Sequence, residues 1–268
     1  LLLSQDTEKQ ANTRLKDLIS LDDSGRPVLD YLLYNAKTAG FKHIYIVIGE
    51  HEYLFKTFYG NKTNQNVFRG LRIDYAIQYI PKNRNKPFGT ADALLQTIMQ
   101  YPELSKSSFS VCNSDNLYSV KALKLLRNSV YRNAFVAYQR DSLDFSLEKI
   151  LKFALVLLDS EGFLSDIIEK PQEENIEDYK DQIGKLYVSM NLFKLDGTLV
   201  TDYLIHCPVN KKRNEKELPT ALLNMVKKHP KSMFGIPLSE HVPDLTSKDD
   251  IQILKRYIQK YYSNIKWD

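Results

Sequence analysis

Short apolar runs alternate with amphipathic stretches along the chain, which is the pattern of a doubly wound α/β sheet. The runs that predict strands lie at residues 44–48, 73–77, 109–112, 134–138, 154–158, 165–168 and 186–193. The run at 44–48 predicts a buried strand. Residues 1–3 have the character of the end of a further, first strand. We therefore expect an α/β fold in which helices flank a doubly wound, mixed and mostly parallel sheet.

Helical spacing of apolar residues predicts helices at 27–39, at about 90–99 and at 248–262. In the first of these, Pro27 suits a first helical turn and Gly40 can end the helix. No linker rich in Pro, Gly or Ser divides the chain, and no internal repeat is visible. Residues 1–268 are therefore expected to form a single domain with its loops on one rim.

Composition and charge exclude several classes of protein. The 43% hydrophobic and 26% charged residues are typical of a folded domain rather than a disordered chain. The net charge of +4 includes only one dense basic run, at 211–213, which suits small phosphorylated ligands better than nucleic acid. The longest apolar run, at 44–48, is too short to span a bilayer, and residues 1–3 do not resemble a signal peptide. We expect a cytoplasmic protein that binds neither nucleic acid nor membrane.

The two cysteines, Cys112 and Cys207, are far apart in the sequence and lie in apolar surroundings. Two buried, reduced thiols are the expected arrangement, rather than a disulfide or a metal site.

A carboxylate follows the strand predicted at 109–112. Asp115 lies in the polar turn 113–116, and ligands of open α/β sheets bind beyond the carboxyl ends of the strands. An aspartate there can hold Mg²⁺, which prefers hard oxygen ligands, over a triphosphate. An aspartate that caps its own turn has the same sequence signature.

Two further motifs carry candidate chemistry. Gly89 and Thr90 open the helix predicted at 90–99 and expose backbone N–H groups to a phosphate or a base edge, although a helix cap explains them equally well. Glu169 and Lys170 follow the strand at 165–168. They can bind sugar hydroxyls and a phosphate, or form an ion pair of little consequence.

Taken in order, these motifs resemble the sugar-1-phosphate nucleotidylyltransferase (NDP-sugar pyrophosphorylase) family, whose domain has a glycosyltransferase-A-like fold. Residues 169–171, Glu-Lys-Pro, match the family's EKP motif, and Gln78 with 89–91 resembles its Q…GTA segment. The remaining similarities are to the GKPLL turn at 25–29, the AGV segment at 37–41, the MN strand at 189–193, the sugar-binding glutamate at Glu215, and the D-x-G-T-P-E-D segment at 244–250.

The chain departs from the family at its beginning. The family opens with a glycine-rich loop that wraps the triphosphate, but here no glycine precedes Gly25, and residues 11–16 match only the tail of the motif. Glycine lets backbone amides approach a phosphate without an intervening Cβ. A divergent working loop, a sequence lacking residues at this point, and a chain that has lost catalysis all explain the departure. We expect a working enzyme.

The resemblance implies an in-line displacement, in which a sugar-1-phosphate oxygen attacks the α-phosphorus of a nucleoside triphosphate and pyrophosphate leaves. It implies a Mg²⁺ ion held by Asp115 and Asp244. The other implied roles are catalysis by Arg14, Lys16 and Lys170, nucleotide binding by Gln78, Gly89 and Thr90, and sugar binding by Glu169, Asn191 and Glu215. The resemblance is also compatible with a homo-oligomer.

Three alternatives stay open. A glycosyltransferase that uses a nucleotide sugar would usually carry an Asp-x-Asp motif, whereas this chain has Asn113-Ser114-Asp115. A catalytically silent relative that binds nucleotide or sugar phosphate would account for the altered first loop. A cytidylyltransferase that acts on phosphocholine-like alcohols has the same fold. The base and the sugar are not specified by the sequence.

Overall fold

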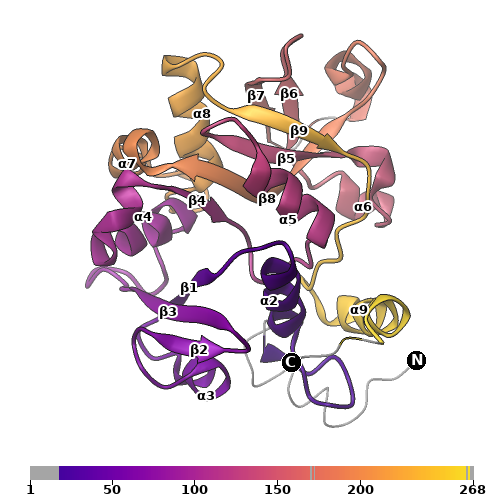
Figure 1. Cartoon of the computed structure of the whole chain (residues 1–268). Helices are drawn as coiled ribbons and strands as arrows, with labels where there is room; N and C mark the ends of the chain where they lie inside the picture. Colours follow the sequence, from indigo (N-terminus) through magenta and orange to yellow (C-terminus); the bar gives the residue numbers. More distant parts are fainter. Residues whose placement is uncertain (1–17, 170, 172, 264, 266–268) are drawn as a thin grey trace.

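The structure, a computed structural model, describes residues 18–169, 171, 173–263 and 265 (Figure 1). Within this part the strands form a three-stranded sheet of order β1-β3-β2 and a six-stranded sheet of order β7-β6-β8-β5-β9, with β4 paired to β8. The small sheet lies below the large one in Figure 1. The predicted residues Arg14, Lys16 and Lys170 lie outside the described residues, as does the strand end predicted at 1–3.

The strands agree with the hydrophobic pattern at almost every predicted position. They are β1 (His43–Gly49), β2 (Asn66–Phe68), β3 (Leu71–Gln78), β4 (Ser108–Val111), β5 (Ala134–Gln139), β6 (Leu155–Leu158), β7 (Leu164–Ile168), β8 (Tyr187–Asp196) and β9 (Phe234–Leu238). The pattern did not predict β2 and β9. The first has only three residues, and the second contains Gly235 and Pro237, which are uncommon inside strands.

The predicted α/β fold with a mixed sheet is confirmed, but parallel pairs form a smaller share than expected. Two described pairs run parallel, β1 with β3 and β5 with β9. The other described pairs are antiparallel: β2 with β3, β4 with β8, β5 with β8, β6 with β7, and β6 with β8. The long strand β8 accounts for the difference, because β4, β5 and β6 all run antiparallel to it.

Helices separate these strands. They are α2 (Val28–Thr38), α3 (Tyr53–Tyr59), α4 (Thr90–Gln100), α5 (Val120–Asn128), α6 (Leu147–Ile150), α7 (Gly197–Ile205), α8 (Leu218–Lys228) and α9 (Lys248–Tyr261), with 3₁₀ turns η2 (Pro102–Lys106), η3 (Arg140–Ser142) and η4 (Glu173–Tyr179). The predicted helices at 27–39, 90–99 and 248–262 are confirmed as α2, α4 and α9. Gly40 does end α2: it has a φ of 95° and donates to Lys37 O, while Phe41 donates to Ala36 O.

Helices cover both faces of the large sheet. In β5, Ala134, Val136 and Tyr138 point into one core, and Phe135 and Ala137 point into the other. The first core includes residues of α2, α5 and α9, and the second includes residues of α4, α7 and α8. Because successive strand residues point to opposite faces, this alternation shows that the sheet is wound on both sides.

Two burial expectations were wrong. The strand at 44–48 is not buried on both faces: Val47 of β1 is 41% exposed, because only alternate residues such as Ile46 and Ile48 point into the core. Cys207 is buried as expected, whereas Cys112, which directly follows β4, is exposed. Both thiols are free.

Among the described residues, none of the helices combines the length and apolar character that a membrane span requires.

Candidate active site

The two predicted metal ligands lie on neighbouring stretches of backbone. Leu245 N–H donates to Asp115 O over 2.9 Å, and Leu117 N–H donates to Pro243 O over 2.8 Å. Between these bonds, Asn116 and Asp244 form an antiparallel bridge. We call residues 115–117 and 243–245 the paired aspartate segments. The structure therefore brings together Asp115 and Asp244, which are far apart in the sequence.

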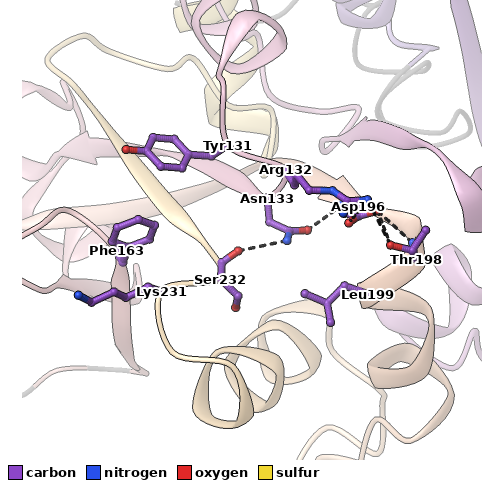
Figure 2. A pocket seen from close by; sticks show the side chains of 9 residues that line it. All are labelled: Tyr131, Arg132, Asn133, Phe163, Asp196, Thr198, Leu199, Lys231 and Ser232. Atoms are coloured by element: carbon purple, nitrogen blue, oxygen red, sulfur yellow. Dashed lines mark hydrogen bonds and ion pairs between the residues drawn. The ribbon is translucent and has the colours of Figure 1, made fainter.

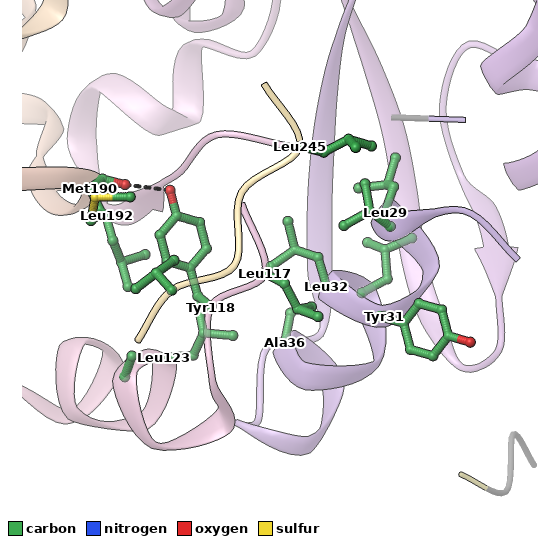
Figure 3. Close-up of a cluster of buried hydrophobic side chains, with 14 of the residues drawn as sticks. Leu29, Tyr31, Leu32, Ala36, Leu117, Tyr118, Leu123, Met190, Leu192 and Leu245 are labelled. Carbon is green, nitrogen blue, oxygen red and sulfur yellow. Dashed lines mark hydrogen bonds between the residues drawn. The ribbon is translucent and has the colours of Figure 1, made fainter. Parts of the chain in front are cut away.

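The paired aspartate segments are anchored in the first core. Leu117 and Leu245, which are 2% and 1% exposed, each follow one of the two aspartates closely in the chain. Figure 3 shows both side chains among the apolar residues of α2, including Leu29 and Leu32. Burial of these leucines holds the backbone on which both carboxylates are carried.

The Asp244 carboxylate is buried, and its Oδ2 is engaged by two groups. Thr246 Oγ1 donates to it over 2.6 Å, and Lys149 Nζ lies 3.0 Å away. Lys149 belongs to α6 and also lies 3.0 Å from Asp250 Oδ1. Burial lowers the pKa of Lys149, but its bonds to Asp244 and Asp250 outweigh burial, and the pKa is raised overall. The ammonium therefore stays charged. Sequence reasoning missed Lys149, which no motif marks.

Asn191 lies at an irregular point of β8. Its φ is 56°, and the pairing of β5 with β8 shifts register between Phe135 and Ala137, opposite this residue. Asn is among the few non-glycine residues that tolerate this left-handed conformation. Val111, at the end of β4, pairs with Phe193, whereas β6 pairs with β8 at Val188. Asn191 therefore lies between the end of β4 and the beginning of β6.

Tyr118 connects the Asp115 turn to the irregular part of β8. Its buried hydroxyl donates to Met190 O over 2.5 Å, as Figure 3 shows, and accepts from Asn113 N–H over 3.4 Å. Burial raises its pKa well above the ordinary value, so the hydroxyl remains a donor at neutral pH. Asp115 and Asn191 thus share one support, which the sequence alone did not indicate.

Glu169 lies at the same end of the large sheet as Asn191. It is exposed and directly follows β7, whose Ile168 pairs with Leu155. Leu155 in turn pairs with Val188. Since β7 and β8 each run antiparallel to β6, both continue in the same direction beyond these pairs. Glu169 is thereby placed two strands away from β8, at about the level of the residue that follows Val188.

Gln78, Gly89 and Thr90 form a second group. Gln78, the last residue of β3, donates its Nε2 to Gly89 O over 3.1 Å and to Asp92 Oδ2 over 3.0 Å. Thr90 Oγ1 accepts from Leu218 N–H over 2.9 Å, at the beginning of α8. The side chains of Gln78 and Thr90 therefore join β3, α4 and α8 at one point.

Gly89 is a requirement of the packing in this second group. Its φ is 101°, and a Cβ there would lie 2.4 Å from Lys216 O and 3.0 Å from Glu215 Cβ. The same backbone segments are bonded to each other, with Lys216 N–H to Phe88 O at 2.7 Å and Ala91 N–H to Lys216 O at 3.0 Å. Glycine is therefore needed here whether or not a nucleotide binds.

Glu215 belongs to this second group as well. Its Oε1 lies 2.8 Å from Lys86 Nζ, which also donates to Arg213 O over 3.0 Å. Arg84 donates to Asn214 O from the same loop. We call residues 80–89 and 208–217 the interlocked loops, because these bonds join the two loops along their length.

The predicted residues thus fall into two groups. Asp115, Asp244, Asn191 and Glu169 gather around the ends of β4 and β7, and Gln78, Gly89, Thr90 and Glu215 gather around the beginning of α4. Among the described residues, no three His, Cys, Asp or Glu side chains converge as a metal site. A cation at the paired aspartate segments would therefore take its remaining ligands from a bound substrate or water, as Mg²⁺ commonly does.

A separate pocket lies at the opposite end of the large sheet (Figure 2). It is found where β5 begins and β8 ends, and its lining includes Tyr131, Arg132, Phe163, Asp196 and Lys231. Both of its cations are already paired, Arg132 with Asp196 at 2.8 Å and Lys231 with Glu161. None of the predicted site residues lines it, so we place the candidate active site at the other end of the sheet.

Solved structures of known proteins share this fold. A solved structure of UDP-glucose pyrophosphorylase complexed with UDP-glucose matches with a TM-score of 0.66 and 18% identity, covering 91% of this chain and 90% of that one. A structure of apo UDP-glucose pyrophosphorylase matches with a TM-score of 0.67 and 17% identity, covering 93% and 92%. At these identities the similarity shows a shared fold.

A family model supplies the stronger result. The model described as nucleotidyl transferase matches residues 11–237, which is most of the chain and includes the region of the altered first loop. The match ends before Asp244, and the position of Asp244 beside the Asp115 turn comes from the structure. The chain belongs to the nucleotidyl transferase family and is a nucleotidyltransferase.

Proposed function

We propose that this chain transfers a nucleoside monophosphate from a nucleoside triphosphate to a sugar-1-phosphate, forming an NDP-sugar and pyrophosphate. The observation that carries the proposal is the pairing of the Asp115 and Asp244 backbone segments beside the irregular part of β8. The likeness to the fold of UDP-glucose pyrophosphorylase supports a sugar phosphate as the acceptor, although it does not identify the sugar or the base.

The donor set of the paired aspartate segments fits a Mg²⁺ ion. It offers carboxylate oxygens, and the Asp244 carboxylate is held in place by Thr246 and Lys149. In the proposed site Asp115 and Asp244 would hold the ion. When bound, Mg²⁺ stabilises the negative charge on the reacting phosphates.

The chain's own residues would contribute position and charge. Gln78, Gly89 and Thr90 would hold the nucleotide at the beginning of α4, where helix N–H groups favour an anionic or polar partner. Glu169, Asn191 and Glu215 would accept or donate hydrogen bonds to sugar hydroxyls. Arg14, Lys16 and Lys170 would neutralise phosphate charge. No covalent intermediate with the protein is needed, since holding the two substrates in line supplies much of the rate enhancement.

We also propose that the chain forms one domain and acts in the cytoplasm, as a monomer or as a homo-oligomer. Size-exclusion chromatography with light scattering would determine the oligomeric state, and limited proteolysis would show whether the chain separates into stable parts.

A pyrophosphate-release assay tests the proposed reaction. The common nucleoside triphosphates are crossed with a panel of sugar-1-phosphates in the presence of Mg²⁺, and phosphocholine is added to the panel. Release that requires one triphosphate and one sugar-1-phosphate supports the proposal and names both substrates. Release with phosphocholine alone would make the chain a cytidylyltransferase of the alcohol type. Triphosphate binding without release would favour the catalytically silent relative.

A further inference from the structure

Lys149 places a positive charge directly against the proposed metal ligand Asp244. Its Nζ lies 3.0 Å from Asp244 Oδ2 and 3.0 Å from Asp250 Oδ1. The Lys149 side chain is 22% exposed, and the two aspartate side chains are 7% and 12% exposed. In such partly buried surroundings a charge is screened less than at the surface.

The ammonium of Lys149 is held in this position by its own element. Ser146 caps the short helix α6 by accepting from the Lys149 N–H, which fixes the backbone from which the side chain extends. The Phe145 ring lies 4.6 Å from Nζ, at a distance that allows a cation–π interaction. Lys149 is thus a defined part of the site and not a mobile surface lysine.

Asp250 has further partners besides Lys149. Asp250 Oδ2 accepts from Thr246 N at 3.1 Å, from Ser247 N at 2.7 Å and from Ser247 Oγ at 3.0 Å. The bond from Ser247 N is part of the capping box of α9. These bonds do not depend on Lys149, and they would keep Asp250 ionised and in place if the lysine were replaced.

The charge of Lys149 affects how a cation binds at Asp244. A divalent cation that binds Asp244 must approach a carboxylate that already forms an ion pair, and it is repelled by the nearby ammonium. We propose that Lys149 is the built-in counter-ion of Asp244 and that it weakens the binding of divalent cations to the free protein. The inference rests on the proposed metal role of Asp115 and Asp244. Cation uptake then favours the substrate-bound state, in which triphosphate oxygens supply additional negative ligands.

The test is a titration of the free protein with Mn²⁺ alone. Electron paramagnetic resonance measures how much of the Mn²⁺ is bound. Lys149→Met and Lys149→Gln both remove the charge, and the second keeps a polar end if the first does not fold. We expect each to bind Mn²⁺ at least about tenfold more tightly than the unaltered chain. Lys149→Arg keeps the charge and should stay within about threefold.

Two further variants separate the inference from the proposed function. Lys194→Met removes the same charge from β8, where Lys194 donates to Ser129 O, and should leave Mn²⁺ affinity unchanged. Asp115→Asn should weaken Mn²⁺ binding in the unaltered chain and in Lys149→Met. Equal or weaker Mn²⁺ binding in both charge-removing variants overturns the counter-ion role. Normal Mn²⁺ binding in Asp115→Asn overturns the metal site itself.

Discussion

The paired aspartate segments and the interlocked loops differ in how their charged side chains are placed and balanced. In the paired segments, a buried carboxylate is matched by Lys149, and the backbone is held by core leucines. The interlocked loops contain seven Lys and Arg residues and two Glu residues, a net charge of +5, whereas the whole chain carries only +4. The rest of the molecule is therefore slightly negative, and the positive excess is concentrated at the beginning of α4.

This difference indicates two separate tasks. Compensated and buried charges fix geometry, because each group is held by several partners. Exposed charges of one sign do little for stability but attract oppositely charged ligands over a distance of about one Debye length, roughly 8–10 Å at physiological salt. We expect the paired aspartate segments to determine turnover and the interlocked loops to affect mainly the capture of anionic substrates.

The largest expected effect is at Asp115. Asp115→Asn keeps the size of the side chain but removes the negative charge, and we expect turnover to fall at least about a hundredfold with the fold intact. Steady-state rates of pyrophosphate release, together with circular dichroism, measure the two properties. Asp202→Asn, at an exposed position of α7, is the matched control and should keep full turnover. Near-normal turnover in Asp115→Asn would remove Asp115 from the metal site.

Gly89 packs one of the interlocked loops against the other, and its replacement should affect stability. Gly89→Ala brings a Cβ against Lys216 O in a backbone conformation that alanine rarely adopts, so the free energy of unfolding should fall by about 2–4 kcal/mol. Gly184→Ala separates the effect of the backbone conformation from that of the close contact. Gly184 also has a positive φ, of 75°, but no atom would lie within 4 Å of its Cβ. Urea denaturation should show the larger loss for Gly89→Ala. Equal losses would mean that contact with the interlocked loops is unimportant.

Tyr118 tests whether the support of the aspartate turn matters for turnover. Tyr118→Phe leaves the buried Met190 carbonyl without its donor, and we expect a loss of about 1–2 kcal/mol in unfolding free energy and a severalfold fall in turnover. Tyr101→Phe removes a similar bond, to Tyr75 O at 2.7 Å, beside the small sheet. The control should lose stability without losing turnover. A fall in turnover in both variants would indicate a general effect of destabilisation.

The smallest expected effect belongs to the interlocked loops. Replacing Lys82, Lys211 and Lys212 together by Gln should raise KM for the substrates a few-fold with little change in kcat, because these exposed lysines steer substrates without positioning them. Raising the ionic strength should reduce kcat/KM of the unaltered chain more than that of the triple variant. A large fall in kcat would instead place these loops in the chemistry.

The elements that the sequence predicted well have strong local causes. The helix α2 has Pro27 before it and Gly40 after it, and the alternation in β5 and β8 follows from burial on two faces. The exposure of Val47 was not predictable from its own segment. It depends on which strands and helices pack against β1, and these come from elsewhere in the chain.

The motifs predict a set of candidate site residues but not their arrangement. The order of the motifs gave the candidate residues, and the structure places Asp115 beside Asp244 and Gly89 beside Glu215. Lys149 and Tyr118 were missed, because each acts through residues distant in sequence: Lys149 through Asp244, and Tyr118 through Met190. Contacts between residues so distant in sequence have no motif that could predict them.

Locating the bound divalent cation in crystals tests the proposed role of the paired aspartate segments. Crystals grown with Mn²⁺ and the triphosphate selected by the release assay would be examined by anomalous scattering. We expect an anomalous peak within coordination distance of both Asp115 and Asp244, and its loss in Asp115→Asn. A peak that contacts neither aspartate, in crystals of an active enzyme, would contradict the assignment of the paired aspartate segments as the catalytic centre.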